Sequence, residues 1–132
     1  MAECGILAQE YIKRTQVFNP VESVELKESQ AENYLQKLAP STKLVLMDEK
    51  GKEFTSKKLS TQINDWLGDP GVKSIAFVIG GPYGFSETIK KMPHTSFTLS
   101  SLTFQGDLAW VILSEQIYRA FTILKGMDYH HQ

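Results

Sequence analysis

Apolar positions in the first part of the chain repeat with helical spacing. Between residues 3 and 16 they recur at Leu7, Ala8, Tyr11 and Ile12, which predicts an amphipathic helix. Residues 21–26, which follow an Asn-Pro turn, have a strand-like composition and favour a short strand. The chain is therefore expected to open on a helix followed by a strand.

A second helix is predicted to start at a capping box. Ser29 and Glu32 have the spacing in which each side chain satisfies a free backbone N–H at the start of a helix. One face then carries an apolar stripe, and Pro40, which has no backbone N–H, is expected to end the helix. The stripe consists of Ala31, Tyr34, Leu35 and Leu38.

Three short apolar runs predict buried strands at residues 44–47, 74–79 and 97–99. Residues 48–52 are expected to form the loop that leaves the first strand. A helix with Ser56 at its N-cap should connect the first two strands and stop at residues 68–71, Gly-Asp-Pro-Gly. A shorter helix that starts near Ser86 and is interrupted at Pro93 should precede the last strand.

The last helix gives the strongest pattern. It is predicted to run from an N-cap at Asp107 to about Leu124, with Gly126 as a left-handed terminator. Its surface is apolar nearly all round, so it must be covered on more than one side, and a second subunit is the simplest cover. Because strands alternate with helices, the expected fold is a single α/β domain with a mostly parallel sheet and helices on both faces.

The balance of charged residues limits how the protein could contact a nucleic acid. Lys and Arg total 14 against 15 for Asp and Glu, so any contact with RNA must use local patches, such as the lysine pairs at residues 57–58 and 90–91. Each pair is equally compatible with an ordinary solvated face.

A single cysteine, Cys4, excludes an internal disulfide and a cysteine-based zinc site. With no apolar run long enough to cross a membrane and no signal peptide, the cytoplasm is the expected location.

Candidate chemistry lies in the last third of the chain. Gly80-Gly81-Pro82-Tyr83-Gly84 follows a predicted strand, where α/β sheets bind ligands, although a tight turn explains the same pattern. A phosphate loop for ATP or NAD is a further alternative, but both of its usual motifs are missing. Arg119 is expected either to pair only with Glu115, four residues earlier, or to bind a ligand. Tyr129, His130 and His131 form an aromatic, titratable tail that is either functional or a loose chain end.

Taken together, several segments resemble the RlmH family of knotted, SPOUT-class methyltransferases, which act on N3 of a pseudouridine in large-subunit (23S) ribosomal RNA. The segments are Val78-Ile79-Gly80-Gly81-Pro82-Tyr83-Gly84-Phe85, Leu99-Ser100-Ser101-Leu102-Thr103-Phe104, Glu115-Gln116-Ile117-Tyr118-Arg119-Ala120 and Tyr129-His130-His131. The resemblance implies a trefoil knot near the C-terminus, a homodimer, S-adenosyl-L-methionine as the cofactor and no metal. It also implies that the substrate is the ribosome or its large-subunit RNA.

The resemblance assigns roles to particular residues. Arg119, Tyr129 and His130 would face the acceptor base across the dimer interface, with arginine and histidine positioning RNA and a histidine assisting proton removal. The cofactor would be surrounded by Met47, Gly80, Gly81, Leu99, Ser100, Ser101, Leu102, Thr103 and Phe104.

The sequence also departs from the family. Residues 105–106 are Gln-Gly where the family usually has a Pro-His or Ser-His pair, and Trp110 stands where many members carry arginine. The family's first strand is expected to be missing from this single SPOUT-type domain, residues 1–132, and its loss would uncover a sheet edge. These departures favour an alternative hypothesis, a catalytically impaired, knotted relative that binds RNA or the ribosome.

Overall fold

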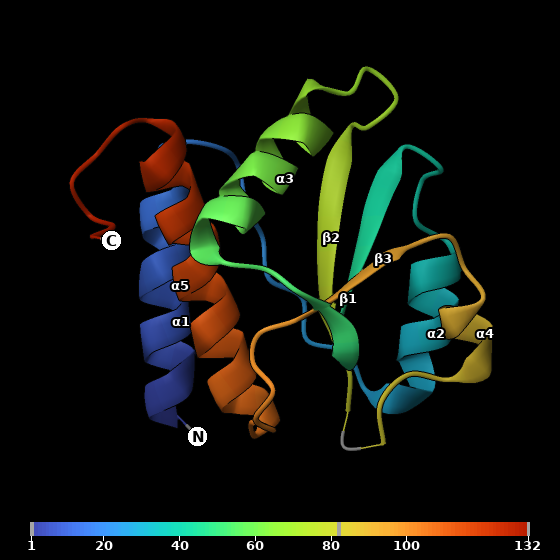
Figure 1. Cartoon of the computed structure of the whole chain (residues 1–132). Helices are drawn as coiled ribbons and strands as arrows, with labels where there is room; N and C mark the ends of the chain where they lie inside the picture. Colours follow the sequence, from blue (N-terminus) through green and yellow to red (C-terminus); the bar gives the residue numbers. More distant parts are fainter. Residues whose placement is uncertain (1, 82, 132) are drawn as a thin grey trace.

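The chain forms a parallel three-stranded sheet with helices on both faces, as Figure 1 shows. The computed structural model describes residues 2–81 and 83–131. The three predicted strands and the α/β class are confirmed, and β1 is central in the strand order β2-β1-β3. The elements are α1 (Ala2–Thr15), α2 (Glu28–Gln36), β1 (Thr42–Glu53), α3 (Ser56–Gly68), β2 (Ser74–Ile79), α4 (Glu87–Lys90), β3 (Thr95–Thr98) and α5 (Gly106–Leu124).

The register of the sheet brings the carboxyl ends of all three strands together. Met47 of β1 pairs with Ile79 of β2 on one side and with Phe97 of β3 on the other. Since neighbouring strands lie about 4.8 Å apart, the segments that follow these residues leave the sheet at one edge. We call this the carboxyl edge.

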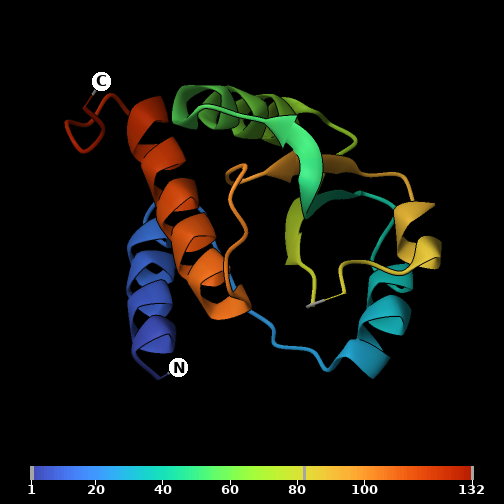
Figure 2. The ribbon, with the colours of Figure 1, turned by 60° about the horizontal axis from the view of Figure 1, so that its bottom comes forward.

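The prediction of a loop at residues 48–52 is wrong. β1 continues to Glu53 through an irregularity, after which Lys52 also pairs with Phe97, and Figure 2 shows the end of β1 crossing β3. Gly51 makes the crossing possible, because a Cβ at this position would lie 2.7 Å from the backbone of Phe97. The polar composition of this segment suggested a loop, but backbone pairing with β3 dominates.

Side chains of β1 alternate between two cores. Val45 faces the helices α3 and α5 and packs with Leu59, Ile63 and Leu113. Its neighbours on β1 face the other way, toward α2 and α4, in a smaller core that consists of Leu35, Leu44, Leu46 and Ile89. The predicted cover of both faces of the sheet is thereby confirmed.

Two helices of the same chain cover α5. α1 lies along α5 and α3 crosses it, as Figures 1 and 2 both show. Ala8 and Ile12 of α1 are buried, and so are Ala120 and Phe121 of α5. This intramolecular cover was not predicted from the sequence, and it leaves Leu108 partly exposed near the start of α5. The homodimer stays a prediction, and so does the trefoil knot.

Residues 21–27 contain no strand, so the prediction of one at 21–26 is wrong. The side-chain amide of Gln16 bonds both backbone groups of Val21: it accepts from the Val21 N–H at 3.0 Å and donates to the Val21 carbonyl. Val24 is half exposed. This segment is therefore an irregular connection whose backbone is held by a side chain.

The capping box of α2 is displaced from its predicted place. The helix starts at Glu28, and the N-cap is Lys27, whose N–H donates to Gln30 Oε1 at 3.2 Å. Ser29 lies inside the first turn, and Glu32 accepts a hydrogen bond from Ser86 of the α4 N-cap at 3.0 Å. Because Glu32 bonds the N-cap residue of α4, it does not cap the start of its own helix.

Two other N-caps are also one or two residues earlier than predicted. Thr55 caps α3 by accepting the N–H of Lys58, so Ser56 is the first helical residue. Gln105 is the N-cap residue of α5, without a side-chain cap bond, and Asp107 lies in the first turn. The predicted left-handed terminator is confirmed at Gly126, with φ of 67°. Among the described residues, none of the helices is long and apolar enough to span a membrane.

Candidate functional site

The residues that the sequence assigned to cofactor binding lie at or just past the carboxyl edge. Met47 is paired between β2 and β3, Gly80 and Gly81 follow β2, and the segment from Leu99 to Phe104 follows β3. Figure 1 shows both following segments at the bottom of the molecule, beside the start of α5. The structure thus brings this group to one edge.

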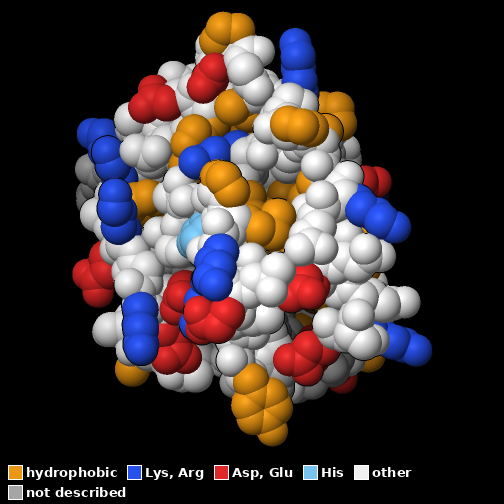
Figure 3. Space-filling view, turned by 90° about the vertical axis from the view of Figure 1, so that its right-hand side faces the viewer, with side chains coloured by type: hydrophobic (Ala, Val, Ile, Leu, Met, Phe, Trp, Pro, Cys, Tyr) orange, Lys and Arg blue, Asp and Glu red, His pale blue; other side chains and the backbone are white. Residues whose placement is uncertain are grey.

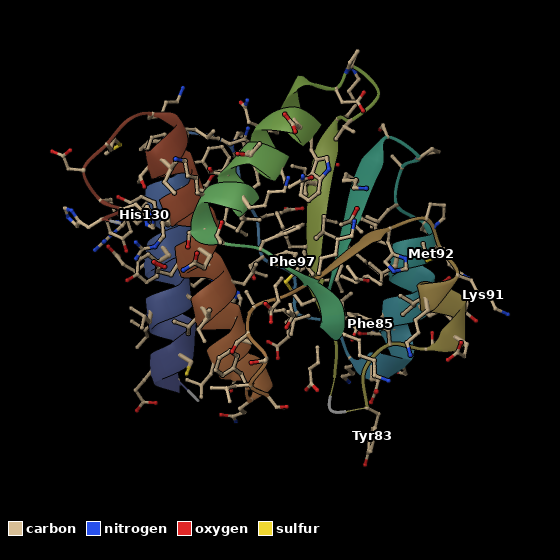
Figure 4. The ribbon with its side chains drawn as sticks, in the orientation of Figure 1. Tyr83, Phe85, Lys91, Met92, Phe97 and His130 are labelled. Atoms are coloured by element: carbon tan, nitrogen blue, oxygen red, sulfur yellow. The ribbon has the colours of Figure 1, made fainter. Side chains whose placement is uncertain are left out.

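The glycine loop after β2 has little room for side chains. A Cβ on Gly80 would lie 3.2 Å from the ring of Phe85 and 3.4 Å from the backbone of Gly84. Gly84 itself has φ of 75°, which disfavours other residues. In Figure 4 Phe85 points toward the molecule, whereas Tyr83 projects away from it and is 91% exposed. The loop therefore exposes its backbone on a tightly packed base.

Local hydrogen bonds shape the loop after β3. The Thr98 hydroxyl donates to the Ser100 carbonyl at 2.5 Å, and the Leu102 N–H donates to Ser100 Oγ at 3.0 Å. The hydroxyl of Thr103 donates to Glu49 Oε1 of β1 at 2.9 Å, which ties this loop to the crossing segment. Leu102 is 68% exposed, so an apolar side chain is left available at the edge.

A small cavity of about 140 Å³ lies against the same loop, between β3 and α5. Thr98 lines it from β3, Leu99 from the loop after β3, and Gln116 from α5. Ser56 donates a hydrogen bond to Gln116 Oε1 at 2.6 Å across this space. Sequence reasoning missed Ser56 as part of the site, and a signal for it was Gln116, one of the few polar residues on a mostly apolar helix.

The features of the carboxyl edge fit S-adenosylmethionine, which joins a flat adenine to a positively charged sulfonium and ammonium. Gly80 supplies a backbone that a Cβ would crowd, and the carboxylate of Glu28 lies 3.4 Å from the Cβ position of Gly81. Half-buried Leu99 and Phe104 provide apolar walls. An acidic side chain beside exposed backbone suits a cationic ligand. Glu28 was not predicted, because its contact with the loop depends on the packing of α2.

The three residues that were assigned to the acceptor form a second cluster, at the C-terminal half of α5. Glu115 accepts from Arg119 Nη2 at 2.6 Å and from Nε at 2.7 Å, and the pKa of Arg119 is raised, mainly by this hydrogen bond. The guanidinium carbon lies 4.8 Å from the centre of the Tyr129 ring, and Nη1 lies 3.0 Å from His130 Nδ1. Arg119 therefore forms the predicted ion pair with Glu115 and also contacts Tyr129 and His130 of the C-terminal tail.

The contact with Arg119 fixes the tautomer of His130. A guanidinium has only N–H donors, so Nδ1 of His130 must accept the hydrogen bond and carry no proton. The proton of the neutral ring is therefore on Nε2, which can donate to a ligand. This sharpens the predicted role of His130: while it binds Arg119, the imidazole presents a donor rather than a base.

Two tyrosines that the sequence did not single out support the cluster. The Tyr118 ring packs on Tyr129 edge-on, with centroids 4.9 Å apart, and on Tyr11 of α1 at 6.1 Å. Burial raises the pKa of Tyr129 to about 12, and a hydrogen bond with Tyr11 and the charge of Glu115 add to this rise. The tail is thereby anchored to both α5 and α1.

The two clusters do not meet within one chain. Arg119 lies about 20 Å along α5 from Gly106, at about 1.5 Å per residue, and Gly106 adjoins the loop after β3. Figure 4 shows His130 on the far side of the α1–α5 pair from Phe85 and Tyr83. The structure therefore gathers each predicted group but keeps the two groups apart.

Comparison with known proteins identifies the class to which this fold and these clusters belong. The family model described as "Predicted SPOUT methyltransferase" matches residues 3–130. The chain therefore belongs to the SPOUT methyltransferase family. The match includes both the carboxyl edge and the Arg119 cluster.

Several relatives are named ribosomal RNA large subunit methyltransferase H, which confirms the resemblance to RlmH. The protein of Parabacteroides distasonis is 46% identical over 106 residues, which are 80% of this chain and 67% of that relative. The protein of Flavobacterium psychrophilum is 43% identical over the same shares. The protein of Geotalea uraniireducens is 36% identical over 133 residues, which cover 92% of this chain and 86% of that relative.

Proposed function

We propose that this protein transfers a methyl group from S-adenosylmethionine to N3 of a pseudouridine in large-subunit ribosomal RNA. The observation that carries the proposal is that the family's cofactor residues all lie at one edge of the sheet, on a chain that matches the family model along residues 3–130. The relatives' names support large-subunit RNA as the substrate class. The protein would then act where ribosomes are, in the cytoplasm.

The carboxyl edge would hold the cofactor. Gly80 and Gly81 offer backbone groups, Leu99 and Phe104 offer apolar walls, and Met47 lies at the base of the site. When bound, the cofactor supplies a methyl group on a positively charged sulfur, which is already activated for transfer. The protein then has to exclude water and to hold the acceptor nitrogen in line with the methyl.

The Arg119 cluster would hold the acceptor. Glu115 fixes the guanidinium and leaves Nη1 directed toward His130, so arginine and histidine present a fixed pair of donors. Such donors suit a phosphate or the carbonyl oxygens of a base. By stabilising negative charge on the base, they would also favour loss of the N3 proton, with no need for His130 to accept it at Nδ1.

The separation of the two clusters supports a homodimer as the active form. Methyl transfer needs the reacting atoms within about 3.5 Å, whereas His130 lies on the far side of the α1–α5 pair from the glycine loop (Figure 4). A second copy can bring its Arg119 cluster to this chain's carboxyl edge. Exposed apolar side chains near that edge and on α1 are available for such an interface: Ile6, Leu7, Leu102 and Leu108.

The decisive experiment is transfer of labelled methyl from S-adenosylmethionine to ribosomes that lack the modification, followed by nucleoside analysis of the RNA. We expect the label in N3-methylpseudouridine of the large-subunit RNA. Transfer to transfer RNA but not to ribosomes would refute the proposed substrate. Calorimetry with the cofactor tests the alternative of an impaired relative, because that alternative predicts no binding.

A further inference from the structure

A second, polar groove lies beside the carboxyl edge, on the side of the molecule that carries α2 and α4. Its volume is about 310 Å³, and among the described residues its lining has no acidic member: it consists of Lys50, Gly51, Lys52, His94, Thr95 and Ser96. Figure 3 shows this side, where basic side chains lie near a histidine and acidic side chains lie below them. None of these residues belongs to the cofactor group or to the Arg119 cluster.

The fold builds this groove from two segments that are far apart in the sequence. The crossing of β1 over β3 places Lys50 and Lys52 next to the start of β3, and it depends on the close approach of Gly51 to the backbone of Phe97. Lys50 and Lys52 both line the groove, on either side of Gly51. The two lysines therefore add their positive charge to one groove.

Lysines and hydroxyl groups supply the donors of the groove. His94 Nδ1 lies 2.6 Å from the Met92 carbonyl, which can only accept, so Nδ1 carries a proton and its hydrogen bond fixes the ring at the rim of the groove. Thr95 and Ser96 add hydroxyl groups. Of the acidic residues on β1, Asp48 accepts the backbone N–H of Lys50 and Glu49 accepts from Thr103, and neither lines the groove.

We propose that the groove formed by Lys50 and Lys52, with the hydroxyl groups of Thr95 and Ser96, binds a phosphodiester of the RNA substrate. Two lysines and hydroxyl donors match the charge and the acceptor oxygens of a phosphate. The groove adjoins the carboxyl edge through β1, so a strand held here runs close to the cofactor without entering its site. This inference rests on the proposed function in so far as the RNA is the methylated substrate.

The other lysine pairs provide a contrast. Lys90 and Lys91 end α4, with Lys90 Nζ 3.8 Å from Glu87, and Figure 4 shows Lys91 pointing away from the molecule. Lys57 and Lys58 are exposed on the first turn of α3 and do not line the groove. The latter pair is therefore a matched control for the loss of two positive charges.

The test compares the double variants Lys50→Gln/Lys52→Gln and Lys57→Gln/Lys58→Gln with the wild type. Affinity for a transcript of the large-subunit RNA is measured by fluorescence anisotropy over a range of salt concentrations. We expect the groove variant to bind about tenfold more weakly, and the slope of log K against log salt to be shallower by about 0.7 for the one phosphate that is no longer neutralised. Thermal unfolding and calorimetry with S-adenosylmethionine should match the wild type.

Other results would overturn the proposal. They are unchanged affinity and slope in the groove variant, an equal loss in both double variants, or lysine-dependent binding of inorganic phosphate with unchanged RNA binding. Methyl transfer to unmodified ribosomes is measured in parallel to separate this proposal from the proposed function. Transfer by the wild type with no effect of Lys50 and Lys52 on RNA binding refutes the groove alone, whereas lysine-dependent RNA binding without transfer refutes the enzyme activity alone.

Discussion

The carboxyl edge and the Arg119 cluster are built in opposite ways. At the carboxyl edge, backbone dominates: glycines, a crossing strand and turns closed by Thr98 and Ser100. In the Arg119 cluster, side chains dominate, since Glu115 binds Arg119 at 2.6 Å and the tail residues pack around it. We therefore expect added side-chain atoms to disturb the carboxyl edge, and the removal of side chains to disturb the Arg119 cluster.

This difference suits the two proposed tasks. A cofactor that is the same in every reaction cycle is well served by a rigid backbone edge that strand pairing defines. A large RNA substrate is better served by charged side chains on a tail that packs on the helices without joining the sheet. Substitutions can distinguish the two regions, because each region is expected to control a different measured quantity.

The largest expected effect is loss of methyl transfer in Arg119→Ala. We expect the rate on unmodified ribosomes to fall about 100-fold or more, because the acceptor loses its fixed donor, while affinity for S-adenosylmethionine stays the same. The matched control is Arg14→Ala on α1, where Arg14 Nε bonds Glu10 at 3.0 Å with the same spacing of four residues, but on an exposed face. A similar loss in Arg14→Ala, or full activity in Arg119→Ala, would contradict the assignment.

Gly51→Ala should lower the free energy of unfolding by about 1–3 kcal/mol in urea titrations. The added Cβ would lie 2.7–2.8 Å from three backbone atoms of Phe97, and no side-chain rotation can relieve that contact. Gly68→Ala is the control, because no atom lies within 4 Å of its Cβ position. Equal stability of the two variants would show that β1 does not need to approach β3 this closely.

Gly80→Ala should weaken binding of S-adenosylmethionine about tenfold in calorimetry, because the loop must shift away from the Phe85 ring, 3.2 Å from the new Cβ. The geometry of the Arg119 cluster should be unaffected. The Gly68→Ala variant again serves as control, and it should bind the cofactor normally. Unchanged affinity in Gly80→Ala would remove this glycine from the proposed cofactor site.

Regular patterns made the elements predictable from the sequence. The period of apolar residues located the three strands and most helices, and family motifs named residues that the fold then gathers at the carboxyl edge and around Arg119. Features that depend on contacts between distant segments were missed or misplaced. Val21 is held by Gln16 instead of a strand neighbour, and the polar crossing of β1 resembled a loop.

The same limit applies to the site. Glu28 meets the glycine loop only because α2 packs beside it, and Tyr11 meets Tyr129 only because α1 lies along α5. The pattern of residues along the sequence does not show which distant segments come into contact. The pairing of Glu115 with Arg119 was predictable, since a helix sets that spacing by itself.

The smallest expected effect concerns Tyr129, whose pKa is raised to about 12 from an ordinary value of 10.0, chiefly by burial. Between these values the unfolded phenol loses its proton while the folded one keeps it, so the contribution of Tyr129 to stability is complete below about pH 10 and is lost as pH rises toward 12. Tyr129→Phe removes this dependence. In urea titrations the difference in unfolding free energy between the wild type and the variant should therefore shrink across this window.

Absorbance of the phenolate gives an independent measurement on the folded protein. We expect a late transition near pH 12 in the wild type, which has five tyrosines, and its absence from Tyr129→Phe. Tyr83→Phe, which changes a side chain that is 91% exposed, should keep the late transition. If Tyr129→Phe also kept it, the tail would not be packed against Tyr11 and Arg119, and the Arg119 cluster would lack the order that distinguishes it from a loose chain end.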